Sequence, residues 1–353
     1  MPKPATPPVT VLSRIASALT YPLRLEDYLA VVDPRHSSRQ LRGLVTAVTR
    51  ETDRVTTLTI RPGRGWLPHR AGQWLRVGVD LDGVRQWRPF SISSAEGADL
   101  TITVGAAGRV SSALAHDTRP GDVLFLDRPQ GDFVLPDAPG PLLFVAAGTG
   151  ITPIMSMIAT RLARRPDADI VLVHASRTPD DAIFARRLAA LASAHRGLRV
   201  LPHFSHHLGR LAFTPVTMGV LAPDWTKRDA FVCGPPGLLA DAEALWDAVG
   251  APLSVERFTL ARRVDPDARG GRVTFARSGR TTDATAAQSL LEAGEGAGVG
   301  LPCGCRMGIC RTCLTRLTDG QVRNLTTGDV HGEPGDLIRT CVSAPAGDVR
   351  LDA

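Results

Sequence analysis

The sequence predicts a multidomain α+β protein in which a β-barrel, an α/β domain and a small cysteine-rich domain follow one another. Three observations predict this order: short alternating strands, then strands alternating with helices, then four of the six cysteines within residues 303–313. A chain of 353 residues is long enough for two or three domains. The expected division is an N-terminal extension (1–40), the barrel (41–137), the α/β domain (138–259), a linker (260–271) and the cysteine-rich domain (272–353).

Composition excludes several classes of protein. Hydrophobic residues make up 43% and charged residues 22%, which is typical of a globular protein. No run of eighteen apolar residues could span a membrane, and the first residues do not resemble a signal peptide. The net charge of +6 comes almost entirely from arginine, without the basic and aromatic clusters of nucleic-acid-binding proteins. The expected compartment is the cytoplasm, where thiols stay reduced.

The first forty residues stand apart from the rest. The proline-rich stretch 1–8 is expected to be disordered, and residues 11–21 and 25–32 are expected to form short helices, the second ended by Asp33-Pro34. One interpretation is a helical cap on the following domain. The other is a docking surface for a membrane-bound partner, which would place the protein at the inner face of the membrane.

The expected barrel rests on regular short strands separated by turn residues, at 44–49, 55–60, 74–79 and 100–104. A further strand ends at Arg88-Pro89-Phe90-Ser91. An arginine can hold a phosphate by a bidentate contact, a phenylalanine can pack against a flat ring, and a serine hydroxyl can bond a ring nitrogen. The alternative is an ordinary strand and turn.

A second candidate site follows the last of these strands. Gly108-Arg109-Val110-Ser111 leads into an expected helix at 112–116. A serine here could simply cap the helix. The same free N–H groups could instead bind a pyrophosphate, to which Arg109 would add positive charge.

From residue 138 the pattern predicts a parallel sheet wrapped by helices. The expected strands are 142–147, 170–173, 199–204 and 230–233, and the expected helices are 153–165, 180–195 and 237–249. Gly148-Thr149-Gly150, followed by Thr152, joins a buried strand to a helix, which is where a phosphate commonly binds. The alternative is a tight turn without a ligand.

Two further loops end strands at the same edge of this sheet, where ligands of open α/β sheets bind. Ser176-Arg177 could hold a 2′-phosphate and favour NADPH over NADH, or could be a solvated surface pair. Cys233-Gly234-Pro235 closes a late strand, and its glycine would let a ligand approach the backbone. Cys233 could equally be a buried apolar residue.

The cysteines carry the most specific signal. Cys305, Cys310 and Cys313 stand in C-x4-C-x2-C spacing and Cys341 follows after twenty-seven residues, the plant-type spacing for a 2Fe–2S cluster. A structural zinc site would use paired C-x2-C knuckles, of which only one is present. A disulfide framework is unusual in a chain of this size without a secretory signal. Cys303 lies outside the spacing and is interpreted as a spare thiol or a substitute ligand.

In the rest of the cysteine-rich domain, a strand is expected at 272–276, a helix at 286–293, a hairpin turn at Asp319-Gly320 and a late strand at 337–341.

R-P-F-S, G-R-V-S, G-T-G-I-T-P, C-G-P-P-G and the C-terminal cysteines, in this order, resemble a ferredoxin–NADP⁺-reductase-type flavoprotein fused to a plant-type ferredoxin. The resemblance covers residue 41 to the end. It implies a flavin-binding β-barrel, a nicotinamide-binding α/β domain and a β-grasp ferredoxin domain. It also implies that Thr149 and Thr152 line the pyridine nucleotide site and that Cys233 lies near the nicotinamide.

The resemblance assigns the flavin contacts as well. Arg88 and Ser111 would hold flavin phosphates, Ser91 would lie near flavin N5, and Phe90 would pack on the isoalloxazine in place of the more usual tyrosine. The expected cofactors are FAD rather than FMN, a 2Fe–2S cluster, and NADPH rather than NADH. The catalytic residues would be Ser91 and Cys233, without a protein acid or base, because the cofactors carry the chemistry.

A narrower resemblance concerns the partner. L-P-C-G-C-R-M-G-I-C-R-T-C and P-L-R-L-E-D-Y-L resemble the reductase partner of bacterial acyl-CoA (stearoyl-CoA) Δ9 desaturases, which implies electron transfer to a membrane-bound di-iron enzyme in fatty acid desaturation. One alternative is the reductase of a soluble multicomponent oxygenase, such as a ring hydroxylase or an aryl-CoA epoxidase. A third is a redox-sensing module that turns nothing over.

Overall fold

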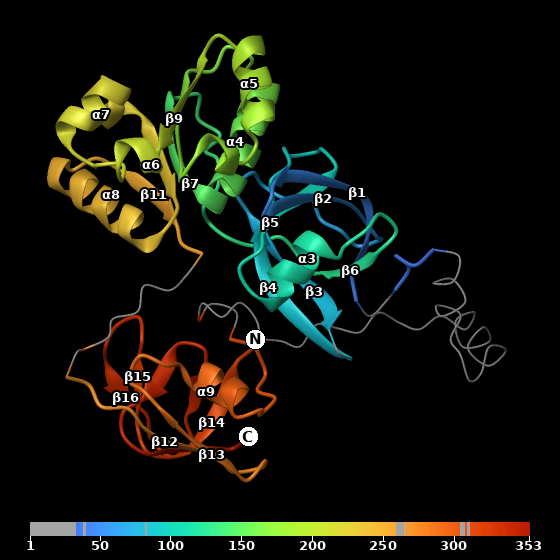
Figure 1. The fold of residues 1–353 in the computed structure, drawn as a ribbon, viewed down its shortest axis with the longest axis vertical. Helices are drawn as coiled ribbons and strands as arrows, with labels where there is room; N and C mark the ends of the chain where they lie inside the picture. The colour runs from blue at the N-terminus through green and yellow to red at the C-terminus, as the bar shows by residue number, and fades with distance from the viewer. Residues whose placement is uncertain are drawn as a thin grey trace.

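The computed structural model describes residues 33–37, 40–81, 83–258, 265, 267–303, 308 and 311–353. The two helices expected at 11–21 and 25–32, as well as Cys305 and Cys310, lie outside the described residues. Figure 1 shows the barrel in blue to cyan beside the α/β domain in green to yellow, with the C-terminal domain in orange to red below them. No helix in the described part of the chain is long and apolar enough to cross a membrane.

The first domain is a closed antiparallel barrel, as predicted. Its sheet has the order β4-β3-β6-β1-β2-β5, and a bridge between Ile92 and Ile102 joins the two edges. Alternate residues point inward to a core that includes Leu58, Leu75 and Ile102. The elements are β1 (Arg42–Thr52), β2 (Val55–Pro62), β3 (Trp74–Leu81), β4 (Val84–Ser91), β5 (Leu100–Gly105), α3 (Arg109–His116) and β6 (Val123–Leu126). The helix expected from residue 112 begins at Arg109, because Gly108 is its N-cap.

The second domain is a five-stranded parallel sheet of order β11-β10-β7-β8-β9, again as predicted. Two separate apolar cores cover its faces, one with α4 and α5 and the other with α7 and α8. The strands are β7 (Leu142–Ala147), β8 (Ile170–Ser176), β9 (Leu198–Phe204), β10 (Asp229–Cys233) and β11 (Leu253–Glu256). The main helices are α4 (Ile151–Arg164), α5 (Ala185–Ala194), α6 (Ser205–Leu208), α7 (Pro215–Leu221) and α8 (Pro236–Val249), with short 3-10 turns η1 (Gly148–Gly150), η2 (Pro179–Asp181) and η3 (Trp225–Lys227).

Two details of this domain differ from the prediction. The helix expected from residue 180 begins only at Ala185, because η2 ends at Asp181 and Phe184 takes a left-handed conformation with φ 61°. The short strand β11 was not anticipated, and it carries Glu256 beside Cys233 of β10.

The C-terminal domain has a five-stranded mixed sheet, β13-β12-β19-β14-β17, and a three-stranded sheet, β16-β15-β18. Parallel pairing of β12 with β19 and the packing of α9 against the sheet give the domain one apolar core. The elements are β12 (Gly271–Phe275), β13 (Arg280–Ala284), α9 (Leu290–Gly296), β14 (Leu314–Asp319), β15 (Val322–Asn324), β16 (Val330–His331), β17 (Leu337–Arg339), β18 (Ser343–Pro345) and β19 (Val349–Leu351).

Two predictions for this domain were wrong. The helix expected from residue 286 begins at Leu290, because Ser289 and Glu292 form a capping box. The hairpin expected at Asp319-Gly320 does not form, since β14 pairs with β17 and β19 while β15 pairs with β16 and β18. Gly320 (φ 84°) lies against the backbone oxygen of Asp348, so the chain turns there from one sheet into the other.

Polar contacts join the barrel to the α/β domain. From α4, Thr160 Oγ1 accepts a hydrogen bond from the Glu96 N–H (3.0 Å), and Arg164 forms an ion pair with the Glu96 carboxylate. Ser156, also on α4, donates to the Ser94 carbonyl and is fully buried. These contacts hold the middle and the carboxyl end of α4 against the barrel.

Candidate functional site

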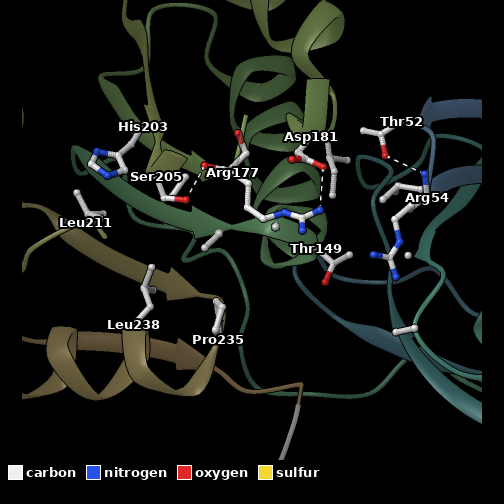
Figure 2. Close-up of a pocket in the computed structure, with 18 of the residues that line it drawn as sticks. Thr52, Arg54, Thr149, Arg177, Asp181, His203, Ser205, Leu211, Pro235 and Leu238 are labelled. Carbon is white, nitrogen blue, oxygen red and sulfur yellow. Dashed lines mark hydrogen bonds and ion pairs between the residues drawn. The ribbon is translucent and has the colours of Figure 1, made fainter. Parts of the chain in front are cut away.

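A cavity of about 620 Å³ lies at the carboxyl ends of β7, β8 and β9, against the barrel. Figure 2 shows its walls: residues of the α/β domain on one side, and Thr52 and Arg54 of the barrel on the other. This is the edge at which open α/β sheets bind ligands. The polar and charged side chains in its lining are Thr52, Arg54, Thr149, Ser176, Arg177, Asp181, His203, Ser205 and Arg210.

Five of the predicted nucleotide-binding residues line this cavity: Gly148, Thr149, Ser176, Arg177 and Pro235. Gly148 has φ 55°, and a Cβ built on it would meet no atom within 4 Å, so its open side faces free space. Its strand, turn and helix setting is therefore the one predicted for phosphate binding.

The other predicted residues of these loops lie behind the wall of the cavity. A Cβ on Gly150 would lie 2.1 Å from the Cys233 carbonyl oxygen, so this glycine lets η1 approach the end of β10. Gly234 packs against Ala147 in the same way. Thr152 is 2% exposed, donates to the Thr149 carbonyl (2.9 Å) and does not line this cavity. Its hydroxyl instead supports the turn that carries Thr149.

The cavity carries a net positive charge. Its lining contains three arginines, at 54, 177 and 210, and one carboxylate, Asp181. Arg177 is mostly exposed and pairs with Asp181 (3.2 Å), while the Ser176 hydroxyl donates to the Thr178 carbonyl (2.8 Å). Such a lining suits a ligand with several phosphate charges.

A second group of side chains lies where the barrel meets the sheet. Ser91, at the end of β4, is 5% exposed and donates a 3.3 Å hydrogen bond to Glu256 of β11. Glu256 in turn pairs with fully buried Cys233 of β10 across the sheet. The two predicted catalytic residues, Ser91 and Cys233, are thus joined by Glu256, which sequence reasoning missed. The signal that could have revealed it is the carboxylate that ends the short stretch Leu253–Glu256 directly after the last helix of the domain.

Burial controls the protonation of this group. Glu256 is partly exposed as a residue, but its carboxyl is surrounded by protein, and this desolvation raises its pKa to about 8 against the opposing effect of the Ser91 hydrogen bond. Burial raises the pKa of the Cys233 thiol well above its usual value, and the nearby Glu256 charge makes a smaller contribution in the same direction. Cys233 is therefore a neutral thiol at physiological pH.

The predicted flavin contacts lie on two neighbouring elements of the barrel. Arg88, Pro89 and Phe90 occupy the last residues of β4, and α3 packs against that strand. Gly108, at the N-cap of α3, is exposed, and a Cβ on it would meet no atom within 4 Å. Arg88 places a positive charge near the end of β4, and the neighbouring N-terminus of α3 is exposed and begins with Arg109. This arrangement fits a flavin that contains phosphate.

Two of the predicted residues in this turn have structural roles. Ser111 accepts hydrogen bonds from the Gly108 and Ala107 N–H groups (2.9 and 3.1 Å), so its hydroxyl caps the helix. Val110 is 2% exposed and packs in the barrel core. The Val110 side chain thus contributes to packing, and any cofactor contact at this position would be made by its backbone.

The described cluster cysteines fit the predicted iron–sulfur site. Cys313 and Cys341 are both buried, and their sulfur atoms lie 3.1 Å apart, too far for a disulfide and close enough to share an iron. The hydrogen bond between the two sulfur atoms lowers the pKa of Cys313 to about 6, which favours the thiolate that iron requires. Cys303 is half-buried at the edge of the same core.

The domain order and the three sites define an electron-transfer oxidoreductase with a dinucleotide site, a flavin barrel and an iron–sulfur domain. Comparison with known families agrees: residues 144–244 match the oxidoreductase NAD-binding domain, and residues 273–346 match the 2Fe-2S iron-sulfur cluster binding domain. The chain is 44% identical over 352 residues to an NADPH oxidoreductase of Mycobacterium tuberculosis, covering 97% of this chain and 92% of the relative.

Other relatives match this chain over most of their own length. One component of the 1,2-phenylacetyl-CoA epoxidase from Escherichia coli is 30% identical, covering 87% of this chain and 95% of that protein. The fold matches that of phthalate dioxygenase reductase with a TM-score of 0.64 and 24% identity, over 89% of this chain and 98% of that one.

The chain belongs to the family of NAD(P)H oxidoreductases that join a reductase of ferredoxin–NADP⁺-reductase type to a C-terminal 2Fe–2S ferredoxin domain. Its cofactors are NAD(P)H, FAD and a 2Fe–2S cluster.

Proposed function

We propose that this protein takes electrons from NADPH and supplies them, through FAD and its 2Fe–2S cluster, to a membrane-bound di-iron acyl-CoA Δ9 desaturase. The observation that carries the redox function is the contact of Ser91 on the barrel with Glu256 on the nucleotide-binding sheet. This contact joins the end of the predicted flavin strand to the sheet whose edge holds the dinucleotide cavity. The desaturase assignment rests on the sequence resemblance described above.

Different residues of the chain would serve the dinucleotide, flavin and cluster sites. Bound FAD would accept a hydride from NAD(P)H and release the two electrons singly to the 2Fe–2S cluster. Thr149 and Gly148 would bind dinucleotide phosphate, and Arg88 with the N-terminus of α3 would hold the flavin phosphates. Ser91 would position the flavin ring, with its own hydroxyl held by Glu256. Cys313 and Cys341 would hold the cluster, together with Cys305 and Cys310.

We also propose that NADPH is preferred to NADH. Arg177 and Arg210 line the cavity, and each is paired with a partly exposed aspartate, Asp181 and Asp241, at 3.2 Å. Exposed ion pairs of this kind are weak, so a dianionic 2′-phosphate can displace the carboxylate. Replacing either arginine by glutamine should raise the KM for NADPH and leave that for NADH nearly unchanged. Equal effects on both dinucleotides would contradict the assignment.

The partner is tested by reconstitution. Purified protein and NADPH are added to membranes that contain an acyl-CoA desaturase, and oleate formation is measured. The control is a Cys341→Ser variant, which is expected to retain flavin but not the cluster. A lack of stimulation by the wild-type protein, together with normal reduction of an artificial acceptor, would count against the desaturase and leave the redox function intact. A shortened chain that lacks residues 1–40 tests whether this segment docks to the partner or to the membrane surface.

A soluble oxygenase is the second candidate partner. It is favoured by the relatives, which include the reductase components of a glycine betaine monooxygenase (Pseudomonas aeruginosa) and a stachydrine N-demethylase (Rhizobium meliloti), as well as the component of the epoxidase. Support of product formation by a purified soluble oxygenase, without membranes, would favour this interpretation. Steady NADPH oxidation with an artificial acceptor would exclude the redox-sensor alternative.

A further inference from the structure

We propose that Arg54, on the flavin-binding barrel, binds the pyrophosphate of the nicotinamide dinucleotide from across the domain interface. Arg54 is the second residue of the two-residue turn between β1 and β2, where Thr52 pairs with Val55. It lines the dinucleotide cavity, which otherwise belongs mainly to the α/β domain. The proposal rests on the use of NAD(P)H by this protein, whatever its electron acceptor.

The Arg54 side chain is held in position but keeps its charge unmatched. One guanidinium nitrogen, Nη2, donates to the Ala106 carbonyl (3.1 Å), and the Arg54 N–H donates to the Thr52 hydroxyl (3.3 Å). Within the described ranges, no carboxylate forms an ion pair with Arg54, whereas both Arg177 and Arg210 have an aspartate partner. A phosphate at this position would therefore compete with no resident acid.

The opposite wall of the cavity indicates which phosphate Arg54 reaches. Figure 2 shows its guanidinium projecting from the barrel toward the side of the cavity where Thr149 lies. The two domains are in close contact here, since a Cβ on Gly105, at the end of β5, would lie 2.9 Å from Thr149 Cγ2. Thr149 belongs to η1, which leads into the N-terminus of α4, where phosphate binding is expected. A pyrophosphate at this turn would thus have N–H groups on one side and a guanidinium on the other.

A contact between Arg54 and the pyrophosphate would not distinguish NADPH from NADH. The pyrophosphate is common to NADPH and NADH, whereas the 2′-phosphate is present only in NADPH. Arg54 is therefore expected to strengthen the binding of both dinucleotides, while Arg210 and Arg177 select between them. Because Arg54 is on the flavin-binding barrel, its contact would also tie the dinucleotide to that domain.

The test uses the flavin-loaded full-length protein and measures dissociation constants for NADPH and NADH from the rate of flavin reduction at increasing dinucleotide concentration. Arg54→Gln should weaken both by a similar factor of about tenfold or more, the range for a hydrogen bond to a charged group. Arg54→Lys, which keeps the charge, should retain most of the affinity. Adenosine 2′-phosphate, which has no pyrophosphate, should bind the variant within about twofold of wild type, since no charge-assisted contact is lost.

The matched control is Arg50→Gln. Arg50 lies on the same hairpin and donates to the Asp53 carbonyl (2.9 Å), but it does not line the cavity. Unchanged affinities in Arg54→Gln, or an equal loss in Arg50→Gln, would overturn the proposal. A loss confined to NADPH would reassign Arg54 to the 2′-phosphate and overturn it as well. If Arg54→Gln loses flavin but binds dinucleotide with unchanged affinity once flavin is saturating, Arg54 would be assigned to the flavin. That result would also overturn the proposal.

Discussion

Replacing Glu256 by glutamine should make the protein more resistant to unfolding at alkaline pH. In the unfolded chain this carboxyl loses its proton near pH 4.5, but burial in the folded protein delays ionisation to about pH 8. Between these values the unfolded state has released the proton and the folded state has not. The unfolded state is therefore favoured increasingly as the pH rises, and the protein loses stability.

The size of the effect follows from the two pKa values. The destabilisation by Glu256 grows from about 1 kcal/mol at pH 5 to at most about 5 kcal/mol at pH 9. Glutamine has no proton to lose, so Glu256→Gln avoids this change of about 4 kcal/mol. With about 2–4 °C per kcal/mol for a unit of 150–250 residues, the wild-type Tm should fall by about 8–16 °C more than that of the variant between pH 5 and pH 9.

The assay is thermal unfolding of the flavin-loaded protein followed by flavin fluorescence, at pH values from 5 to 9. Asp247→Asn, which removes an exposed carboxylate of α8 from the same domain, controls for the change in net charge. The rate of flavin reduction by NADPH gives a second measurement, which should change near pH 8 in the wild type and remain flat in Glu256→Gln. Parallel Tm profiles for the wild type and Glu256→Gln would refute the reasoning.

Three further predictions concern other parts of the chain. Cys341→Ser should lose its iron and the visible absorption of the cluster but retain flavin and the reduction of two-electron dyes; full iron content in the variant would rule out Cys341 as a ligand. Arg76→Ala removes the 3.2 Å hydrogen bond from the barrel to Thr312, next to Cys313, and should slow flavin-to-cluster transfer several-fold in stopped-flow experiments. Flavin reduction by NADPH should keep its rate, and an equal slowing of both steps would point to a general loss of structure. Arg228→Ala breaks the pairing of a buried arginine with Asp169 (2.8 Å) and should cost about 2–3 kcal/mol, or about 4–12 °C in Tm. An unchanged Tm would show that this pair contributes little.

Local patterns in the sequence were enough to predict the three domains and most of their elements. Hydrophobic periodicity and turn residues are local properties, so the barrel strands, the parallel strands and the helices following Gly150 and Pro235 were expected close to where they lie. The same holds for the cysteine spacing, because three of the four predicted cluster ligands, Cys305, Cys310 and Cys313, lie close together in the sequence. Helix starts were less exact, since capping by Gly108 or Ser289 depends on one or two residues.

Tertiary structure alone decided which distant residues meet. Ser91 and Glu256 are 165 residues apart, and only the closing of the barrel against the end of β11 brings them together and buries the carboxyl. Arg54 is an ordinary turn residue in the sequence, and it acquires a role only because β5 packs against Thr149. The turn at Gly320 was mistaken for a hairpin for the same reason: strand pairing is settled by long-range hydrogen bonds, and a local turn signal does not contain that information.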